Sequence, residues 1–219
     1  MRRADREGLT QLRRAAFVSL VAALLGVINT LLQEYAPIVQ VSPTTTGPNL
    51  HVGSTAPLWA GLAIGLPLLG LELLFLRFAF RALLRFDTTF STPSGLSLLA
   101  LAGLPILAAG YALLIAALLQ AVGCAGAGNP VSLSCLLTPT FSGAVGLLVI
   151  GGLLTLIGYV GVLVGIWRFG THFDNGLFKA GAILLIFPLL ALVGAILLLV
   201  GAARALERLP PKGAVATFS

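Results

Sequence analysis

The stretch "GAVGLLVIGGLLTLIGYVGVLVGIW" (143–167) decides the class of this protein, because it carries no charged side chain over its whole length. At a rise of about 1.5 Å per residue, a helix of this length crosses a hydrocarbon core of roughly 30 Å. The apolar run is continuous and does not alternate with a period of two, which argues against a transmembrane barrel. The stretch therefore predicts a membrane-spanning helix.

The whole chain repeats this pattern. Of its 219 residues 58% are hydrophobic and 9% are charged, against roughly 25% charged residues in soluble domains. The composition predicts an all-α integral membrane bundle (15–206) between a basic amino-terminal segment (1–14) and a flexible tail (207–219). Pro67, Pro105 and Pro188 fall inside spans and predict kinks without helix ends. The five predicted spans are Ala15 to Tyr35, Pro57 to Phe80, Leu96 to Val122, Gly143 to Trp167 and Leu177 to Leu206.

The Lys and Arg residues flank the spans, which predicts contact with anionic lipid head groups and disfavours nucleic acid. With five crossings, ten of the 13 basic residues lie on the side of the amino terminus and three on the other. The positive-inside rule then places the amino terminus in the cytoplasm and the carboxy terminus outside the cell membrane. If 177–206 were instead a re-entrant hairpin, all 13 would lie on one side; we expect five crossings, because that segment is too short for two full spans.

Two sequence features concern how the spans relate to one another: a weak internal repeat and pairs of glycines at helical spacing. "RFDTTF" (85–90) matches "RFGTHF" (168–173), and Pro105 then aligns with Pro188, so helices two and three would form a parallel repeat of helices four and five, unless the match is chance. Glycine pairs at GxxxG spacing, Gly61/Gly65 and Gly161/Gly165, favour close helix packing within the chain or between protomers.

The two ends of the chain carry a resemblance. "REGLTQLRRAAF" near the amino terminus and "GIWRFGTHFDNGLFKAGAILLIFPLLALVGAILLLVG" near the other end resemble the archaeal family of multi-pass membrane proteins known as domain of unknown function 973. The middle of the chain is similar only in hydropathy and length, and the two cysteines and the Pro/Thr-rich loop depart from the family. The resemblance implies an archaeal membrane protein and no known activity.

Glu72 is the leading candidate residue, since it lies about 22 Å into the second span at about 1.5 Å per residue and acids inside membranes are rare. Tyr159 is expected at similar depth and could hydrogen-bond the acid, with Asn29 or Thr155 nearby. The functional alternative is a proton or cation relay. We favour a structural carboxyl group, because a single acid makes a poor pathway.

Basic residues at the span ends are predicted to bind lipid head groups: Arg77, Arg81, Arg85, Arg168 and Lys179. In "WRFGTHFDNGLFKAG" (167–181), Gly170 is expected to end the fourth helix and Asp174 or Asn175 to cap the fifth. His172 and Asp174 make a weak metal pair without a third ligand, so we predict no metal and no cofactor.

The two loops expected on the outer side of the membrane, 36–56 and 123–142, carry no basic residue. Cys124 and Cys135 are spaced for a structural disulfide, with free thiols as the alternative. The segment 36–57 is expected to be an irregular loop, although "IVQV" and "LHV" would also suit a short strand pair.

No nucleophile with its base, phosphate loop or metal cluster stands out, so we predict that the protein is not an enzyme. The leading interpretation is a membrane scaffold, accessory subunit or interaction protein, as a homo-oligomer or with a membrane protein partner. The alternative is a small transporter or channel with Glu72 in an intramembrane polar pathway.

Overall fold

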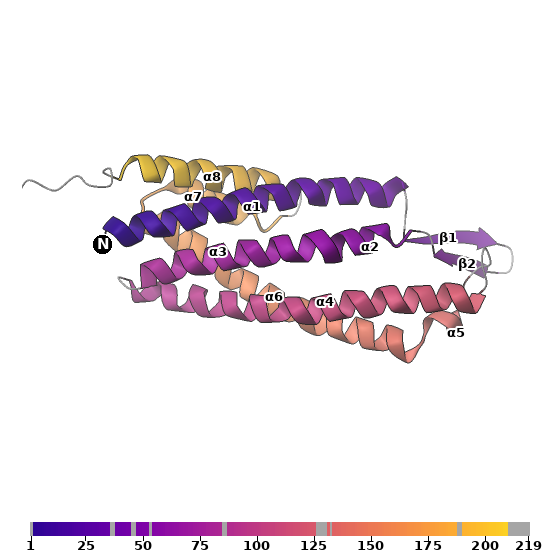
Figure 1. Ribbon diagram of the computed structural model, residues 1–219. Coiled ribbons are helices and arrows are strands. Elements are labelled where there is room, and N and C mark those ends of the chain that lie inside the picture. Colours follow the sequence, from indigo (N-terminus) through magenta and orange to yellow (C-terminus); the bar gives the residue numbers. More distant parts are fainter. Residues whose placement is uncertain are drawn as a thin grey trace, which may run out of the picture. The chain divides into compact units, whose positions relative to one another are not determined.

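The structure, a computed structural model, is helical over most of its length and describes residues 2–35, 38–44, 47–52, 54–84, 87–125, 131, 133–187 and 190–209. The longer helices are α1 (Arg2–Tyr35), α3 (Leu66–Leu84), α4 (Ser91–Ala125), α6 (Pro139–His172) and α8 (Ala191–Glu207). The shorter elements labelled in Figure 1 are strands β1 (Val39–Thr44) and β2 (Gly47–Val52) and helices α2 (Ala56–Ala60), α5 (Leu133–Leu136) and α7 (Gly176–Leu184). Two further short elements are the π-helix η1 (Gly61–Gly65) and the 3-10 helix η2 (Thr88–Phe90).

The chain divides into two compact units whose boundaries fall inside the long helices. The basic unit comprises Met1–Val21, Leu71–Leu98 and Gly158–Ser219, and the apolar unit comprises Ala22–Gly70 and Leu99–Ile157. The sequence ranges of the basic unit contain all 13 Lys and Arg residues. The apolar unit contains a single charged residue, Glu34.

Four helical stretches of the described chain are long and apolar enough to cross a membrane: Ala4–Leu31, Ala56–Leu84, Thr88–Cys124 and Pro139–His172. They agree with the first four predicted spans, so the chain has the features of a membrane-embedded protein. α1 begins well before the predicted start at Ala15. Leu9 and Leu12 are fully buried, so the basic amino-terminal segment belongs to a helix with one apolar face and is not a separate tail.

The predicted fifth span, 177–206, is not one helix, and five spans are not confirmed. α7 and α8 form an antiparallel hairpin, in which a Cβ at Gly181 would lie 3.2 Å from the Gly194 carbonyl oxygen. Asn175, just before α7, donates from Nδ2 to the carbonyl oxygen of Gly201 in the second half of α8 (3.1 Å). The end of α8 therefore returns toward the beginning of α7.

α7 is short, and the chain bends after it instead of continuing as one spanning helix. The nine residues of α7 extend about 13 Å at 1.5 Å per residue, less than half of a hydrocarbon core. Pro188 lies outside the described residues, but α7 ends before it, so the expected kink without a helix end is wrong for this segment. Backbone amides of the bend donate locally, as required in lipid: Leu185 to Gly181 (3.0 Å), Ile186 to Ile183 (3.2 Å) and Phe187 to Leu184 (3.1 Å).

The other two prolines lie within helical structure. Pro67 has no N–H to donate and its ring crowds the carbonyl four residues earlier, and the π-helix η1 directly precedes this site, with the Leu66 amide donating to the Gly61 carbonyl. Pro105 lies inside the continuous helix α4. Both positions agree with proline inside a span.

Glycines allow α4 and α6 to approach closely within each unit. In the apolar unit, a Cβ at Gly103 would lie 2.9 Å from the Gly151 carbonyl oxygen. In the basic unit, a Cβ at Gly161 would lie 2.3 Å from Leu96 Cβ. The Gly161/Gly165 pair therefore serves packing within the chain. A Cβ at either Gly61 or Gly65 would meet no atom within 4 Å.

The apolar unit also contains the two loops expected on the outer side of the membrane. β1 and β2 pair antiparallel with Val39 opposite Val52, as the two adjacent arrows in Figure 1 show. The expectation of an irregular loop is therefore wrong for this segment, and the strand-pair alternative holds. Cys124 and Cys135 are joined by a disulfide with a Cα separation of 5.9 Å, as predicted.

The predicted repeat is not confirmed. α4 continues through Pro105 for 35 residues, whereas the aligned segment is broken into α7 and α8. The two matching sequence segments instead contact each other in the basic unit, where the Phe90 and Phe169 ring centroids are 5.4 Å apart.

Candidate functional site in the basic unit

Glu72 is buried, with 7% of its surface exposed. It lies on α3, twelve residues before the end of the helix at Leu84, which is about 18 Å along the axis. Its carboxyl group accepts a hydrogen bond from the Ser19 hydroxyl of α1, and it interacts electrostatically with Tyr159 of α6. Three helices of the basic unit therefore meet at one carboxyl group.

This arrangement changes the predicted partners. Ser19 takes the role that the sequence suggested for Tyr159, and no hydrogen bond joins Glu72 to Tyr159 among the contacts of the described residues. Asn29 and Thr155 belong to the apolar unit. Thr155 donates to the Gly151 carbonyl of its own helix (2.8 Å), and Asn29 Oδ1 is buried without a partner.

A second polar contact lies at the end of α6. His172 Nε2 is 3.3 Å from Asp5 Oδ1, near the start of α1. The His172 ring stands edge-on to Phe90 and Phe173, with centroids 6.1 and 4.8 Å away. The carboxylate partner of His172 is therefore Asp5, and the weak metal pair with Asp174 is replaced by a link between two helices.

Asp87 lies in the turn between α3 and α4 and interacts electrostatically with His172. Its side chain caps η2 by accepting from the Thr89 amide (2.9 Å). The hydroxyl and amide of Thr89 hold the pKa of Asp87 below its usual value, because both donate to the ionised carboxylate. Arg168 donates to the Thr89 carbonyl oxygen, so this predicted head-group residue ties α6 to the turn.

An aromatic core supports these polar contacts. The side chains of Phe80, Phe90, Phe169 and Phe178 are all fully buried. Ring centroids are 5.9 Å apart for Phe80 and Phe169, and 6.3 Å apart for Phe169 and Phe178. This core was not predicted from the sequence: Phe90 and Phe169 lie in "RFDTTF" and "RFGTHF", whereas Phe80 and Phe178 lie outside both segments.

The other predicted basic residues differ in their surroundings. Arg77 is half-buried and its Nε is enclosed without a hydrogen-bond partner, whereas Arg81 is exposed. Arg85 lies outside the described residues. Lys179 Nζ lies 5.8 Å from the centroid of the Trp167 ring, so Lys179 is held against α6.

The turn after α6 is capped differently from the prediction. α6 continues through Gly170 to His172, and Asp174 adopts the left-handed conformation with φ 46°. The amides of Asp174 and Asn175 donate to the carbonyls of Thr171 (3.4 Å) and Gly170 (2.9 Å), which is a Schellman arrangement. Gly170 is needed for close approach, since a Cβ there would lie 2.7 Å from Lys179 Cγ. Asn175 caps α7 as predicted, accepting from the Leu177 amide (3.0 Å).

The arrangement joins helices and shows no metal-ligand group: no three His, Cys, Asp or Glu residues of the described chain are placed to hold an ion. Ser19 and Asp5, which were not predicted from the sequence, supply the α1 side of both polar contacts.

Residues 5–218 match the family model described as "Protein of unknown function (DUF973)". No curated protein and no solved structure matches the chain.

Proposed function

The chain belongs to the DUF973 family, and we propose that it is an integral membrane scaffold, accessory subunit or interaction protein and not an enzyme. The enclosure of Glu72 carries this proposal. An acid that relays protons or cations must exchange them with water or with further polar groups along a path. Glu72 is 7% exposed and hydrogen-bonded to Ser19, which suits a carboxyl group that holds helices together.

The proposal includes a topology in which both chain ends lie in the cytoplasm. The antiparallel α7–α8 hairpin supports it, because a hairpin that enters and leaves on one side puts all 13 basic residues on that side. The disulfide between Cys124 and Cys135 belongs to the apolar unit and fits an oxidising compartment on the other side. The re-entrant alternative is thus preferred to a carboxy terminus outside.

Reconstitution into liposomes tests the role of Glu72. We expect wild type and Glu72→Gln to show the same proton flux under an imposed pH gradient, with Glu34→Gln as the matched control, because Glu34 is exposed in the apolar unit. A flux in wild type that Glu72→Gln abolishes and Glu34→Gln preserves would refute the scaffold proposal.

Copurification in mild detergent tests the scaffold role itself. We expect a membrane protein partner, or further copies of this chain, at a fixed stoichiometry. A monomer that retains no partner across several mild detergents would contradict the proposal.

The alternative is a small transporter or channel with Glu72 in a polar pathway. One observation favours it: Gln11 and Arg77, also in the basic unit, each bury a polar atom without a hydrogen-bond partner. Such atoms are costly in an apolar interior, and a path for water or ions would satisfy them. Flux that falls in both Glu72→Gln and Gln11→Leu would support this alternative.

A further inference from the structure

Trp167 lies on the outer side of α6 in the basic unit. At about 100° per residue, it points away from the buried Phe169 and lies between the directions of Arg168 and Gly170. Trp167 is 45% exposed. The indole therefore faces the surroundings of the basic unit near the end of a membrane-spanning helix, where tryptophan is typical of the interface.

Lys179 places a cation at this indole. Its ammonium lies 5.8 Å from the centroid of the Trp167 ring, and its stem packs where Gly170 has no side chain. Lys179 forms no ion pair with any carboxylate that the structure describes. Its positive charge is therefore available to a ligand.

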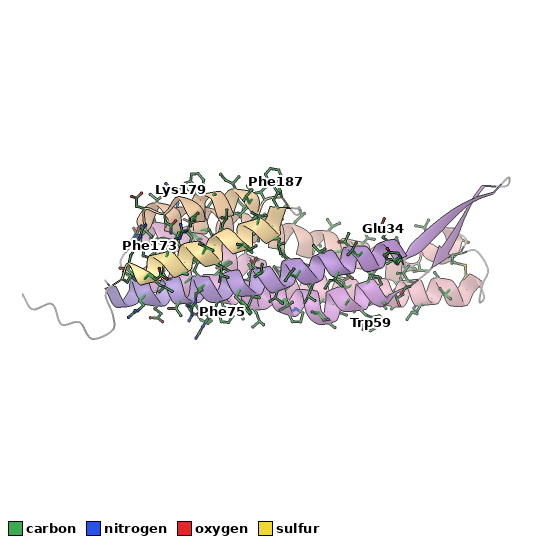
Figure 2. The ribbon with its side chains drawn as sticks, turned by 90° about the horizontal axis from the view of Figure 1, so that it is seen from above. Glu34, Trp59, Phe75, Phe173, Lys179 and Phe187 are labelled. Atoms are coloured by element: carbon green, nitrogen blue, oxygen red, sulfur yellow. A yellow bond between two sulfur atoms is a disulfide. The ribbon has the colours of Figure 1, made fainter. Side chains whose placement is uncertain are left out.

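Two rows of exposed apolar side chains start at this point. On α6, the exposed Val164 and Val160 lie at helical spacing from Trp167. After Lys179, the exposed Ile183 lies on α7 and the exposed Ile186 lies in the bend that follows α7. Figure 2 shows Lys179 on the outer side of the α7–α8 hairpin, with Phe187 on the same side toward the bend. The surface thus has a cation and an indole at one end and apolar side chains beyond them.

We propose that Trp167 and Lys179 bind the head group of one acidic phospholipid, whose acyl chain lies along the apolar rows of α6 and α7. The groups along this surface follow the same order as the parts of the lipid. The ammonium meets the phosphate, the indole lies at the depth of the glycerol, and the aliphatic side chains contact the acyl chain. A soluble anion would leave the apolar rows uncovered. The site extends the proposed function, since it rests on the membrane placement and gives the scaffold a lipid preference.

Fluorescence quenching by brominated lipids tests this site in the full chain. The sequence has two tryptophans, so Trp59→Phe leaves Trp167 as the reporter. We expect brominated phosphatidylglycerol, as a minor component of phosphatidylcholine vesicles, to bind near Trp167 about fivefold more strongly than brominated phosphatidylcholine, the attraction expected of one basic residue near a charged lipid.

Lys179→Gln should remove this preference. Arg204→Gln should keep it, because Arg204 is an exposed basic residue in the last turn of α8, and the cation that the described residues place over the indole is Lys179. Equal quenching by both lipids in wild type, an unchanged preference in Lys179→Gln, or an equal loss in Arg204→Gln would overturn the site. So would a preference that inorganic phosphate abolishes at constant ionic strength, since the ligand would then be phosphate alone.

The same quenching measurement tests the acidic lipid site and the membrane placement of the chain separately. Quenching by brominated phosphatidylcholine shows that Trp167 meets the bilayer, so a missing preference refutes only the acidic lipid site. Absence of quenching by either lipid would contradict the membrane placement itself.

Discussion

Gly165→Ala should destabilise the protein, because the new methyl group has no room. A Cβ at Gly165 would lie 2.3 Å from Cζ and 2.5 Å from Cε1 of Phe80, and 2.9 Å from Cβ of Pro93. Carbon atoms in contact prefer about 3.5–4.0 Å, so the Phe80 ring must move by about 1 Å. Phe80 is fully buried between Phe90 and Phe169, which leaves the ring no free direction.

The expected loss follows from two opposing terms. Overpacking of a dense core costs about 3 kcal/mol at the upper end of its usual range, and alanine in a helix gains about 1 kcal/mol over glycine. The net loss of about 2 kcal/mol corresponds to a fall in apparent Tm of roughly 4–8 °C for a chain of this size.

This fall in apparent Tm is measured on the detergent-purified protein: samples are heated to a series of temperatures, and size-exclusion chromatography then gives the fraction that remains folded. Gly152→Ala is the matched control in the same helix, since its Cβ would meet no atom within 4 Å, and its Tm should stay level or rise slightly. Phe80→Leu in the Gly165→Ala background should recover part of the loss, because the shorter side chain vacates the site. Equal Tm values for the Gly165 and Gly152 variants would refute the packing argument.

Four further predictions concern other parts of the chain. Asp87→Ala should lower the apparent Tm at pH 7, and the difference from wild type should shrink below about pH 4, because the lowered pKa of Asp87 means that its stabilisation is lost as the carboxylate takes up a proton; a constant difference would contradict the cap. Asp174→Gly should raise the apparent Tm by roughly 1–3 °C, since glycine adopts a positive φ without strain; a fall would show that the Asp174 side chain matters more. Alkylation should modify Cys124 and Cys135 only after reduction, as judged by the mass of the intact protein; adducts without reduction would exclude the disulfide. A fluorescent protein fused after Ser219 should fold and fluoresce in the cytoplasm, and an active periplasmic-type reporter at that position would support five crossings instead.

The spans could be predicted because length and hydropathy alone determine whether a segment can cross lipid. For 177–206, a re-entrant hairpin was weighed but one span was expected, because the segment has the length and composition of one tilted helix. The local signals of the hairpin were Gly181 and Gly194, the small residues at which its two arms meet. Their pairing is a long-range fact that a hydropathy profile does not contain.

The candidate site was predicted only in part, because long-range contacts are not visible in the sequence. Glu72 was identified because an acid in an apolar span is conspicuous in any sequence, and its partner depended on helix register. Gly8 packs against Leu83, and the antiparallel register that this contact sets brings Ser19 opposite Glu72. The Asp5–His172 pair joins positions 167 residues apart, and nothing local in either segment indicates it.

The hydrogen bond from Asn175 to Gly201, where the two ends of the α7–α8 hairpin meet, has a consequence for how the protein enters the membrane. Asn175 links the two arms at their base, accepting from Leu177 and donating to Gly201. In the proposed topology, the last basic residues of the chain stay on the side where they were synthesised. Moving one arginine through the bilayer centre costs about 2.5–3.5 kcal/mol on insertion scales. The two helices can therefore insert together as a formed hairpin, and no positive charge crosses the bilayer.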